Sequence, residues 1–500
     1  MTTCVLGLDI GTSGTKALLV EAHAGAVLAA TTESYPSSMP RPLWSEQHPD
    51  DWWAATVRAI RTVLDDAPGA IDVVAVGLAG QMHGLVALDG DGAVIRPAIL
   101  WNDQRTGAAC DEIHARVGRE RMLRLTGNPA LPGFTAPKLV WMREHEPDAF
   151  AAIRHVLLPK DYVRFRLGDA LASDVSDASG TAMLDVAARD WSDAVLDALD
   201  LDRARLPRVV ESSAVCAHVT TGAAAATGLR AGTPIVGGAG DQAAQAVGVG
   251  VVDPGTIAAT IGTSGVVFAP SASYRPDPTG GLHAFCHAAP ERWHLMGVML
   301  SAGGSLRWLA ETLGRCDYDV MLDAASTVRP GAEGAMFAPY LAGERMPHVD
   351  PYVRGAFVGL TARHGAAHLV RAVIEGVSFG LAAGLDRLGA LGIEATAVRV
   401  SGGGAAHASW RRVLADVFDR PLVTVNSVHG AAFGAALLAS VGAGVHTDVA
   451  TAAGALVRVV ETIDPGPDAA RYRDLRALHD ELYPLLAPLS RRLHEATDAG

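Results

Sequence analysis

The chain is poor in lysine and cysteine. Lysine occurs only at positions 16, 138 and 160, and arginine supplies the rest of the 41 basic residues. No cluster of Lys and Arg interrupts a net charge of −13, so nucleic acid is not an expected partner. The five cysteines form no C-x-x-C pair, which argues against a zinc site and against a disulfide framework.

Signals for membranes and secretion are also missing from the sequence. No uninterrupted apolar stretch reaches about 18 residues, so no membrane span is expected. The first ten residues, "MTTCVLGLDI", contain no basic segment and include Asp9, which argues against a signal peptide. We therefore expect a soluble, cytoplasmic protein with no membrane partner.

One short motif occurs twice in the chain, as "IGTSGTK" from Ile10 and "IGTSGVV" from Ile261. Each copy follows an apolar run and precedes another, which predicts strand, tight turn and strand. Glycines at both ends of Gly-Thr-Ser-Gly permit positive φ and let backbone amides converge on an anion such as a phosphate. With 500 residues, 49% of them hydrophobic, the chain is long enough for two large domains. A duplicated α/β fold with one such loop in each lobe explains the repeat, and it predicts domains at 1–250 and 251–445 with a helical tail at 446–500.

Other segments carry plainer signals. Residues 49–66 predict an amphipathic helix, 85–101 a hairpin and 108–202 a mostly helical region. A long helix is expected over 368–388, and one charged helix from about residue 467.

The segment "GAGDQA", residues 238–243, allows two interpretations. It fits the dinucleotide pattern G-x-G-x-x-A, but no acidic residue ends the next strand about 20 residues on. Alternatively, Asp241 begins a helix whose dipole favours the ionised carboxylate at pH 7, so that it can accept a proton from a hydroxyl attacking a phosphoryl group. A plain helix-capping aspartate remains a further alternative. The chain has neither the P-loop pattern nor the protein-kinase motifs.

Two longer segments resemble the signatures of the FGGY family of carbohydrate kinases, within the sugar kinase–Hsp70–actin superfold. They are "GFTAPKLVWMREH" (133–145) and "GAFVGLTARHGAAHLVRAVIE" (355–375). Together with both GTSG loops, "GGAGDQAAQAVG" and "SGGGAAHASWRRVLAD", the resemblance covers nearly the whole chain. It implies a two-lobed, duplicated ribonuclease H-like α/β fold with an interdomain cleft, and an enzyme that uses ATP and Mg²⁺.

Within the family, "LWSEQHPDDWW", "QMHG", "LLPKDY" and "YLAGERMPH" resemble the kinases of D-xylulose. The resemblance implies ATP-dependent phosphorylation of this ketopentose at O5. Gln242 stands where many of those kinases have Asn and where glycerol kinases have Gln, so a kinase for ribulose, gluconate or xylitol stays open. So does a non-catalytic sugar sensor. The protein is expected to be a monomer or a homodimer.

The resemblance also implies roles for single residues. Asp241 becomes the general base, and Asp9 holds Mg²⁺ through water. Lys138 and Lys160 are expected to be structural. For His83 and Asp103, a satisfied polar histidine and a turn aspartate remain alternatives to sugar contacts. The implied sugar-binding residues are Met82, His83, Trp101, Asp103 and Gln242, and the implied ATP-binding residues are Gly11, Thr12, Ser13, Lys16, Gly262, Thr263, Gly402, Gly403 and Gly404.

Overall fold

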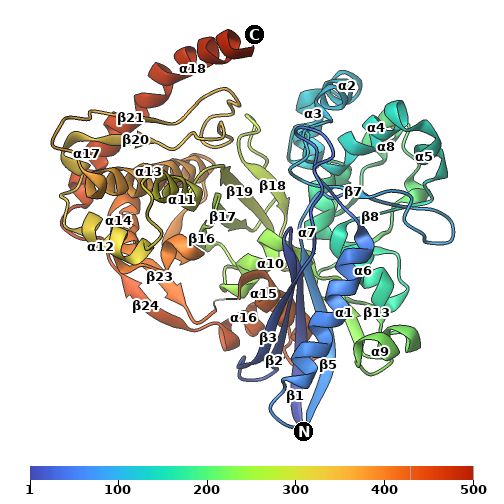
Figure 1. The fold of residues 1–500 in the computed structure, drawn as a ribbon. Helices are drawn as coiled ribbons and strands as arrows, with labels where there is room; N and C mark the ends of the chain where they lie inside the picture. Colours follow the sequence, from blue (N-terminus) through green and yellow to red (C-terminus); the bar gives the residue numbers. More distant parts are fainter. Residues whose placement is uncertain (428, 499–500) are drawn as a thin grey trace.

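The first of two mixed β-sheets is built from the N-terminal half of the chain. The protein is represented by a computed structural model that describes residues 1–427 and 429–498. Strands β1 (Thr2–Ile10), β2 (Gly14–Glu21) and β3 (Val27–Ser34) form an antiparallel meander, and β5 (Ile71–Gly80) runs parallel to β1 (Figure 1). The sheet order is β13-β14-β5-β1-β2-β3, with β15 also paired to β5. The added strands are β13 (Val215–His218), β14 (Pro234–Val236) and β15 (Ala239–Gly240).

Both faces of this sheet are covered, which is why β1 is apolar almost throughout. Leu6 and Leu8 lie in one cluster with Trp52 of helix α1 (Pro49–Asp65). Val5, which precedes Leu6, packs on the other face, in a cluster with residues of α15 (Gly430–Gly442). Side chains therefore alternate between two helical layers, as a period of two requires.

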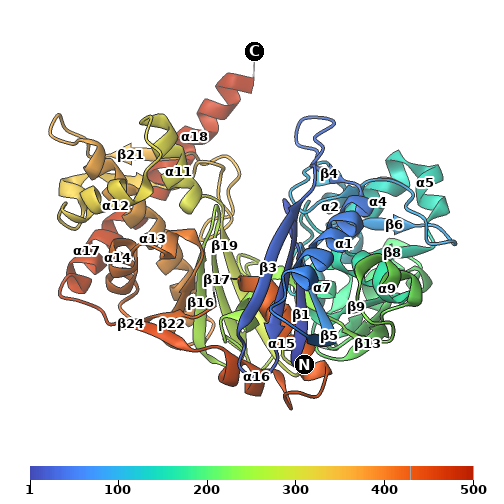
Figure 2. The ribbon, with the colours of Figure 1, turned by 60° about the horizontal axis from the view of Figure 1, so that its bottom comes forward.

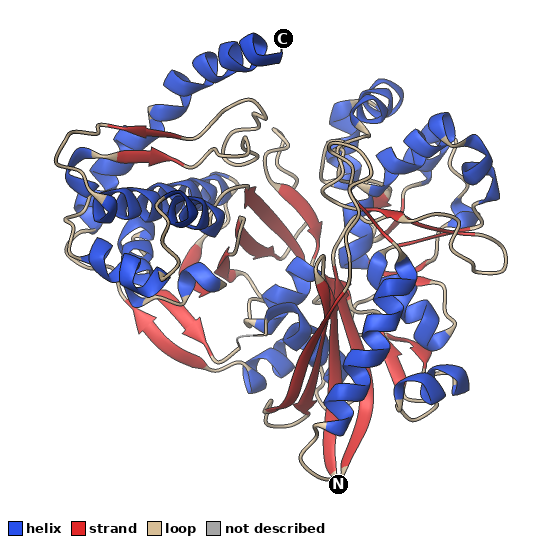
Figure 3. Ribbon diagram, in the orientation of Figure 1, coloured by secondary structure: helices blue, strands red, loops and turns tan. Residues whose placement is uncertain are grey.

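The second sheet repeats the connectivity of the first. Its order is β18-β19-β17-β16-β22-β23-β24; β16 pairs antiparallel with β17 and parallel with β22, as β1 does with β2 and β5. Figure 3 shows helices flanking both sheets. The predicted duplication is thus confirmed, and each GTSG motif turns between the first two strands of its sheet. The strands are β16 (Gly255–Ile261), β17 (Gly265–Ser271), β18 (His283–Cys286), β19 (Trp293–Met299), β22 (Ala395–Ser401), β23 (Leu422–Val425) and β24 (Val459–Ile463).

Helix α15 joins the two halves. It follows the second sheet in the chain but packs against β1 and β5, and against α10 (Asp241–Gly248). It lies between the sheets in both ribbon views (Figures 1 and 2). Glycines allow the approach: a Cβ on Gly7 would lie 2.0 Å from the Ala432 carbonyl oxygen, and one on Gly77 2.0 Å from that of Ala435. The domain limits at residues 250 and 445 remain a prediction, since part of the second predicted domain packs on the first sheet.

Two local predictions need correction. Strand β6 (Val86–Leu88) pairs with β8 (His155–Leu157), and β7 (Ala98–Ile99) pairs with β4 (Glu46–Gln47), so residues 85–101 form only isolated bridges among themselves. The expected hairpin is therefore irregular: antiparallel bridges join its two arms, and each arm also pairs with a strand distant in sequence. The expected single tail helix is two helices, α17 (Ala469–Asp480) and α18 (Leu482–Asp498).

The long predicted helix is α13 (Ala366–Ala390). It is the one described helix that is long and apolar enough to span a membrane. However, 72% of its most apolar 18-residue stretch is buried inside the protein, as in a core helix. The region 108–202 is mostly helical, as predicted. The remaining elements are α2 (Gly107–Val117), α3 (Arg119–Thr126), α4 (Thr135–His145), α5 (Pro147–Ala152), α6 (Pro159–Gly168), β9 (Ala172–Asp174), α7 (Val175–Ala178), β10 (Leu184–Asp185), β11 (Asp190–Trp191), α8 (Asp193–Leu199), β12 (Arg208–Val210), α9 (Thr221–Thr227), α11 (Gly303–Thr312), α12 (Tyr318–Ser326), β20 (Met336–Ala338), β21 (Ala356–Val358), α14 (Ala408–Phe418) and α16 (Val449–Leu456), with 3₁₀ turns at Ser179–Thr181, Arg203–Arg205, Ala332–Gly334 and Gly403–Ala405.

Candidate active site

The first GTSG turn connects β1 to β2 and is held from outside by three side chains. Gln47 Nε2 donates to the Thr12 carbonyl over 2.7 Å, and Trp101 Nε1 donates to Thr12 Oγ1 over 3.0 Å. Thr12 Oγ1 in turn donates to Gln81 Oε1. The backbone amides of Thr12 and Ser13 have no acceptor among the described residues. Two free amides on a fixed turn form an anion-binding concavity.

The second turn has the same open amides and borders a cavity of about 420 Å³. Thr263 Oγ1 accepts a hydrogen bond from Arg307 Nη2 over 2.8 Å, and the carbonyls of Gly262 and Thr263 accept from the start of α11. Four predicted ATP residues line this cavity. The lining comprises Ile261, Gly262, Thr263, Gly303, Leu306, Arg307, Tyr318, Asp319, Leu322, Gly403, Gly404, Ala406, His407 and Trp410.

Gly402 does not line that cavity but shapes its floor. Its φ is +87°, and a Cβ there would lie 2.6 Å from the Ile261 carbonyl oxygen. A Cβ on Gly404 would lie 2.3 Å from Ile261 Cγ2. These two glycines let the loop after β22 lie directly against β16, which leaves room above it for a flat group.

A second, smaller cavity of about 150 Å³ lies where the two halves meet. It brings together the candidate base and four of the five predicted sugar residues. Both halves of the chain contribute to its wall. The lining comprises Met82, His83, Trp101, Leu131, Gly133, Phe134, Asp241, Gln242, Ser264, Val266, His283, Met296, Val298 and Arg345.

His83 is held in a strained conformation with one ring nitrogen available to this cavity. Its φ is +70°, which is rare for a residue with a side chain. Lys138 Nζ and Thr135 Oγ1 donate to its carbonyl at 2.7 and 3.0 Å. Nδ1 lies 2.5 Å from the Gly180 carbonyl, so Nδ1 carries the proton and Nε2 is left as an acceptor. Burial lowers the pKa of His83 to about 3, which keeps the ring neutral.

Asp241 and Asp9 form an electrostatically coupled pair. Burial, and secondly the charge of Asp9, raise the pKa of Asp241 to about 7. The hydrogen bond that the Gln242 amide donates to its carboxylate over 2.7 Å acts in the other direction and lowers this pKa. This corrects the expectation that the helix dipole keeps Asp241 fully ionised at pH 7, because desolvation outweighs the dipole. Burial also raises the pKa of Asp9 to about 6, offset by Lys16. A base with a pKa near the working pH is suited to proton transfer.

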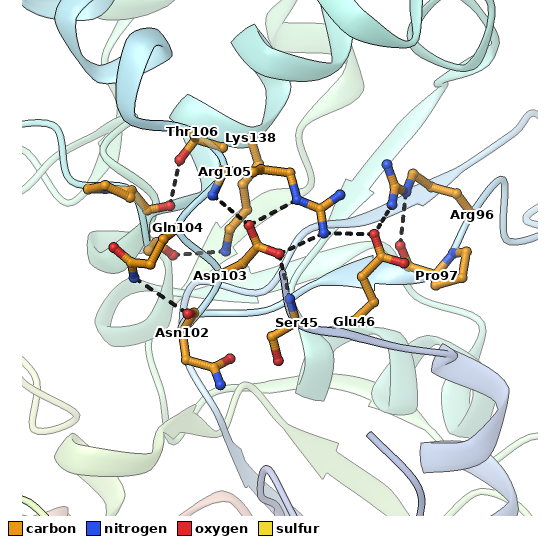
Figure 4. Close-up of polar contacts among 12 residues, drawn as sticks. Ser45, Glu46, Arg96, Pro97, Asn102, Asp103, Gln104, Arg105, Thr106 and Lys138 are labelled. Carbon is orange, nitrogen blue, oxygen red and sulfur yellow. Dashed lines mark hydrogen bonds and ion pairs between the residues drawn. The ribbon is translucent and has the colours of Figure 1, made fainter. Parts of the chain in front are cut away.

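Asp103 is the predicted sugar residue that the structure places elsewhere. It is fully buried, and its carboxylate accepts from the Ser45 amide over 2.7 Å and from Arg105 Nη2 over 2.6 Å (Figure 4). Arg105 Nη2 also pairs with Glu46 Oε1 at 2.8 Å, and the guanidinium lies 3.5 Å from the ring centre of Trp44. With its oxygens occupied, Asp103 stabilises the loop that carries Trp101 and does not reach the smaller cavity.

The three lysines have different surroundings. Lys16 faces Asp9 in the β1–β2 register and lines neither cavity. Lys138 is fully buried, and desolvation lowers its pKa well below the usual value. Lys160 is also fully buried; it pairs with Asp161, Asp174 and Asp177 at 2.6, 2.8 and 3.1 Å.

Several lining residues were missed by sequence reasoning. His283 and Arg345 enter the smaller cavity from the second half of the chain, and Arg307 and Trp410 border the larger one. Arg345 stands inside "YLAGERMPH", a segment used above only as a family marker. A basic residue between Glu and Met carried no local sign of a binding role.

Two sheets of like connectivity, each with an amide-lined turn, and a carboxylate with a pKa of about 7 on the wall of the smaller cavity are the features of the sugar kinase–Hsp70–actin fold. Models of the N- and C-terminal domains of the FGGY family of carbohydrate kinases match residues 4–248 and 257–443. The chain belongs to this family and is a sugar kinase, a class that implies a sugar and a nucleotide as substrates. It is 45% identical over 490 residues to xylulose kinase of Escherichia coli K12, covering 96% of this chain and 100% of that one.

Two further comparisons place the chain within the family. It is 30% identical to gluconokinase of Bacillus subtilis, covering 88% of this chain and 87% of that one. The structure of ligand-bound xylulose kinase from Lactobacillus acidophilus superposes with a TM-score of 0.92 at 27% identity, covering 98% and 100% of the two chains. The dinucleotide interpretation of "GAGDQA" is therefore wrong.

Proposed function

We propose that this chain transfers the γ-phosphoryl group of ATP to O5 of D-xylulose. The observation that carries the proposal is the shared cavity of Met82, His83, Asp241 and Gln242, in a chain 45% identical to a xylulose kinase. Because the terminal hydroxyl must lose its proton as it attacks, the reaction needs a base at that point.

In the proposed reaction, Asp241 accepts the proton of the 5-hydroxyl as O5 attacks the γ-phosphorus in line. The bond from phosphorus to the bridging oxygen breaks, and ADP leaves. Nε2 of His83 accepts a hydrogen bond from a sugar hydroxyl, and Trp101 and Met82 exclude water beside it. The amides of the two GTSG turns bind phosphate oxygens from opposite sides, and the base and ribose lie over residues 402–404.

Mg²⁺ fits the residues beside Asp241. Asp9 Oδ1 is buried and has no hydrogen-bond partner among the described residues, which suits a carboxylate that faces a hydrated cation. No group of three or more candidate ligands occurs in the described part of the chain, and Mg²⁺ needs none because it keeps several waters and binds phosphates. When bound, the ion neutralises charge on the phosphates.

Both cavities are lined by residues of one chain, so one chain forms the proposed catalytic unit. A monomer and a homodimer both accommodate this, and sedimentation at several concentrations distinguishes them. Since ATP is the proposed donor, the cytoplasm is the proposed location.

The test is a substrate panel with the purified protein, ATP and Mg²⁺. D-xylulose, D-ribulose, D-gluconate, xylitol and glycerol are compared by ADP release, and the product is assigned by ³¹P and ¹³C NMR. We expect the highest kcat/KM for D-xylulose, with phosphate on O5. A higher kcat/KM for another compound of the panel would identify that compound as the substrate in place of D-xylulose. ADP release without a phosphorylated product would contradict phosphoryl transfer to a sugar.

A further inference from the structure

Arg345 reaches the sugar-sized cavity from the second half of the chain. It lies in the segment between β20 and β21 and lines the same cavity as His83 and Asp241, which come from the first half. It is the one arginine on that cavity wall. None of the roles derived above uses it.

The guanidinium of Arg345 has no hydrogen-bond or ion-pair partner among the described residues, although it is only partly exposed. Other arginines inside the protein are paired: Arg105 with Asp103, Arg164 with Asp161 and Arg371 with Glu375, at 2.6 to 2.7 Å. Removing a guanidinium from water without a partner costs free energy. An unpaired arginine on a cavity wall therefore indicates acceptor atoms on the molecule that fills the cavity.

The backbone that carries Arg345 is fixed. Glu344 Oε1 accepts from the amide of Leu300 over 2.9 Å and from that of Arg345 over 2.8 Å. The backbone of Glu344 also pairs with Asp350, and Met346 is fully buried. The backbone from which the guanidinium projects therefore needs no reordering when a ligand binds.

Arg345 lines the smaller cavity together with His83 and His283. Its charge contributes to the low pKa of His83 and of His283, while Asp9 is the charge that acts on Asp241. Arg345 therefore acts on both histidines that line the cavity with it and with Asp241. With its reacting hydroxyl at Asp241, a sugar in this cavity has its other end free to meet Arg345.

The chemistry of a ketopentose identifies that other end. Ring closure of a 2-ketopentose to a furanose uses the 5-hydroxyl, so a sugar phosphorylated at O5 must be held in its open-chain form. The open chain has a free C2 carbonyl, which only accepts hydrogen bonds, and a guanidinium only donates them.

We propose that Arg345 is a specificity residue that donates hydrogen bonds to the C2 carbonyl oxygen of the open-chain ketopentose. The proposal rests on the proposed function, since it assumes transfer to O5. It assigns recognition of the keto group to the second half of the chain, and proton transfer to the first.

The experiment compares Arg345→Met and Arg345→Lys with wild type on D-xylulose, xylitol and D-gluconate. Xylitol replaces the carbonyl by an alcohol, and gluconate carries a carboxylate. The control is Arg354→Met, at an exposed arginine later in the same segment whose guanidinium bonds only the backbone carbonyls of Pro351 and Val353. For a substrate turned over too slowly, binding to the protein saturated with an ATP analogue is measured by calorimetry.

We expect Arg345→Met to lower kcat/KM for D-xylulose about 10–100-fold and kcat/KM for xylitol at most about threefold. The preference for D-xylulose over xylitol, measured as the ratio of the two kcat/KM values, should therefore fall. Arg345→Lys should retain an intermediate preference, with the KM for ATP unchanged, and Arg354→Met should match wild type. The lysine variant also keeps the test valid if the methionine variant fails to fold.

An equal fall in kcat/KM for D-xylulose and xylitol, in a variant that stays active, would overturn the specificity role of Arg345 and leave the proposed function standing. A selective loss on gluconate, with xylulose unaffected, would assign Arg345 to a carboxylate instead and overturn the carbonyl contact. Wild-type protein inactive on D-xylulose would overturn the proposed function first, and this inference with it.

Discussion

Trp101 Nε1 donates a hydrogen bond to Thr12 Oγ1 over 3.0 Å. Trp101 lines the smaller cavity, and Thr12 belongs to the first GTSG turn, so this bond connects the proposed sugar site to the proposed phosphate site. One side chain thus serves both places, since its ring lines the smaller cavity and its N–H holds the turn.

Trp101→Phe should therefore affect both substrates. The ring is kept while the bond is lost, and one neutral hydrogen bond is worth about 0.5–1.5 kcal/mol, or roughly 2–10-fold. We expect the KM for D-xylulose and the KM for ATP to rise together by that factor in steady-state assays. Trp53→Phe, on α1 and outside both cavities, is the matched control. A change in the sugar KM alone would show that the turn does not depend on this bond.

Asp241→Asn should lose activity and gain stability at alkaline pH. Removing a general base costs about 10²–10⁴-fold in rate, so kcat should fall by that factor with ATP binding retained. For wild type, kcat/KM should rise with pH through about 7, where Asp241 loses its proton. An exposed Asp148→Asn variant should leave that profile unchanged.

Asp241 makes the stability of wild type fall with rising pH, whereas activity rises. The folded pKa of Asp241, about 7, lies above the ordinary 3.8, so its contribution to the free energy of unfolding is complete below the ordinary value and is lost as pH rises through about 7. Asp241→Asn should have a higher Tm than ligand-free wild type at about pH 8, and the difference should vanish near pH 4. A Tm difference independent of pH would contradict the raised pKa.

Lys138→Met should weaken sugar binding through His83. The ammonium that holds the His83 carbonyl at 2.7 Å is lost, and the strained backbone can relax. We expect the KM for D-xylulose to rise about 3–10-fold with the KM for ATP unchanged. If the effect passes through His83, the double variant Lys138→Met/His83→Ala should be no worse than His83→Ala alone. Additive losses would give Lys138 a separate role.

Thr263→Val should act on the nucleotide alone. It removes the oxygen that accepts from Arg307 over 2.8 Å beside the larger cavity. We expect the KM for ATP to rise about 2–10-fold at saturating sugar, with the KM for D-xylulose unchanged. Thr312→Val, which removes an exposed hydroxyl on α11, serves as control. An unaltered KM for ATP would mean that the second GTSG turn is an ordinary turn with no role in binding ATP.

Gly402→Ala and Gly403→Ala should differ in stability. The first places a Cβ 2.6 Å from the Ile261 carbonyl oxygen at a φ of +87°, whereas nothing lies within 4 Å of a Cβ on Gly403. We expect thermal melting to show a lower Tm for Gly402→Ala and a Tm near wild type for Gly403→Ala. Equal values would mean that the loop after β22 shifts at little cost.

Local patterns predicted the parts of the site that depend on neighbours in sequence. Apolar runs around Gly-Thr-Ser-Gly predicted two strand–turn–strand units, and a strand end followed by a helix start placed Asp241 correctly at the first turn of α10. These predictions succeeded because turn geometry and helix initiation are set by a few adjacent residues.

Predictions failed where a distant partner decided the outcome. Asp103 looked available for a sugar, yet Ser45 and Arg105 occupy its carboxylate. The hairpin expected over 85–101 forms only as isolated bridges, and its arms also pair with residues 46–47 and 155–157.

The sequence alone determined the duplicated α/β architecture, the two GTSG turns and the candidate base, because strand periodicity, glycine conformation and helix starts are local properties. Only the tertiary structure decided the rest of the site. It brought Arg345 beside His83, coupled Asp9 to Asp241 and raised the pKa of the base toward 7. Burial and charge–charge interactions depend on distances between segments that lie far apart in the chain, and no local pattern encodes those distances.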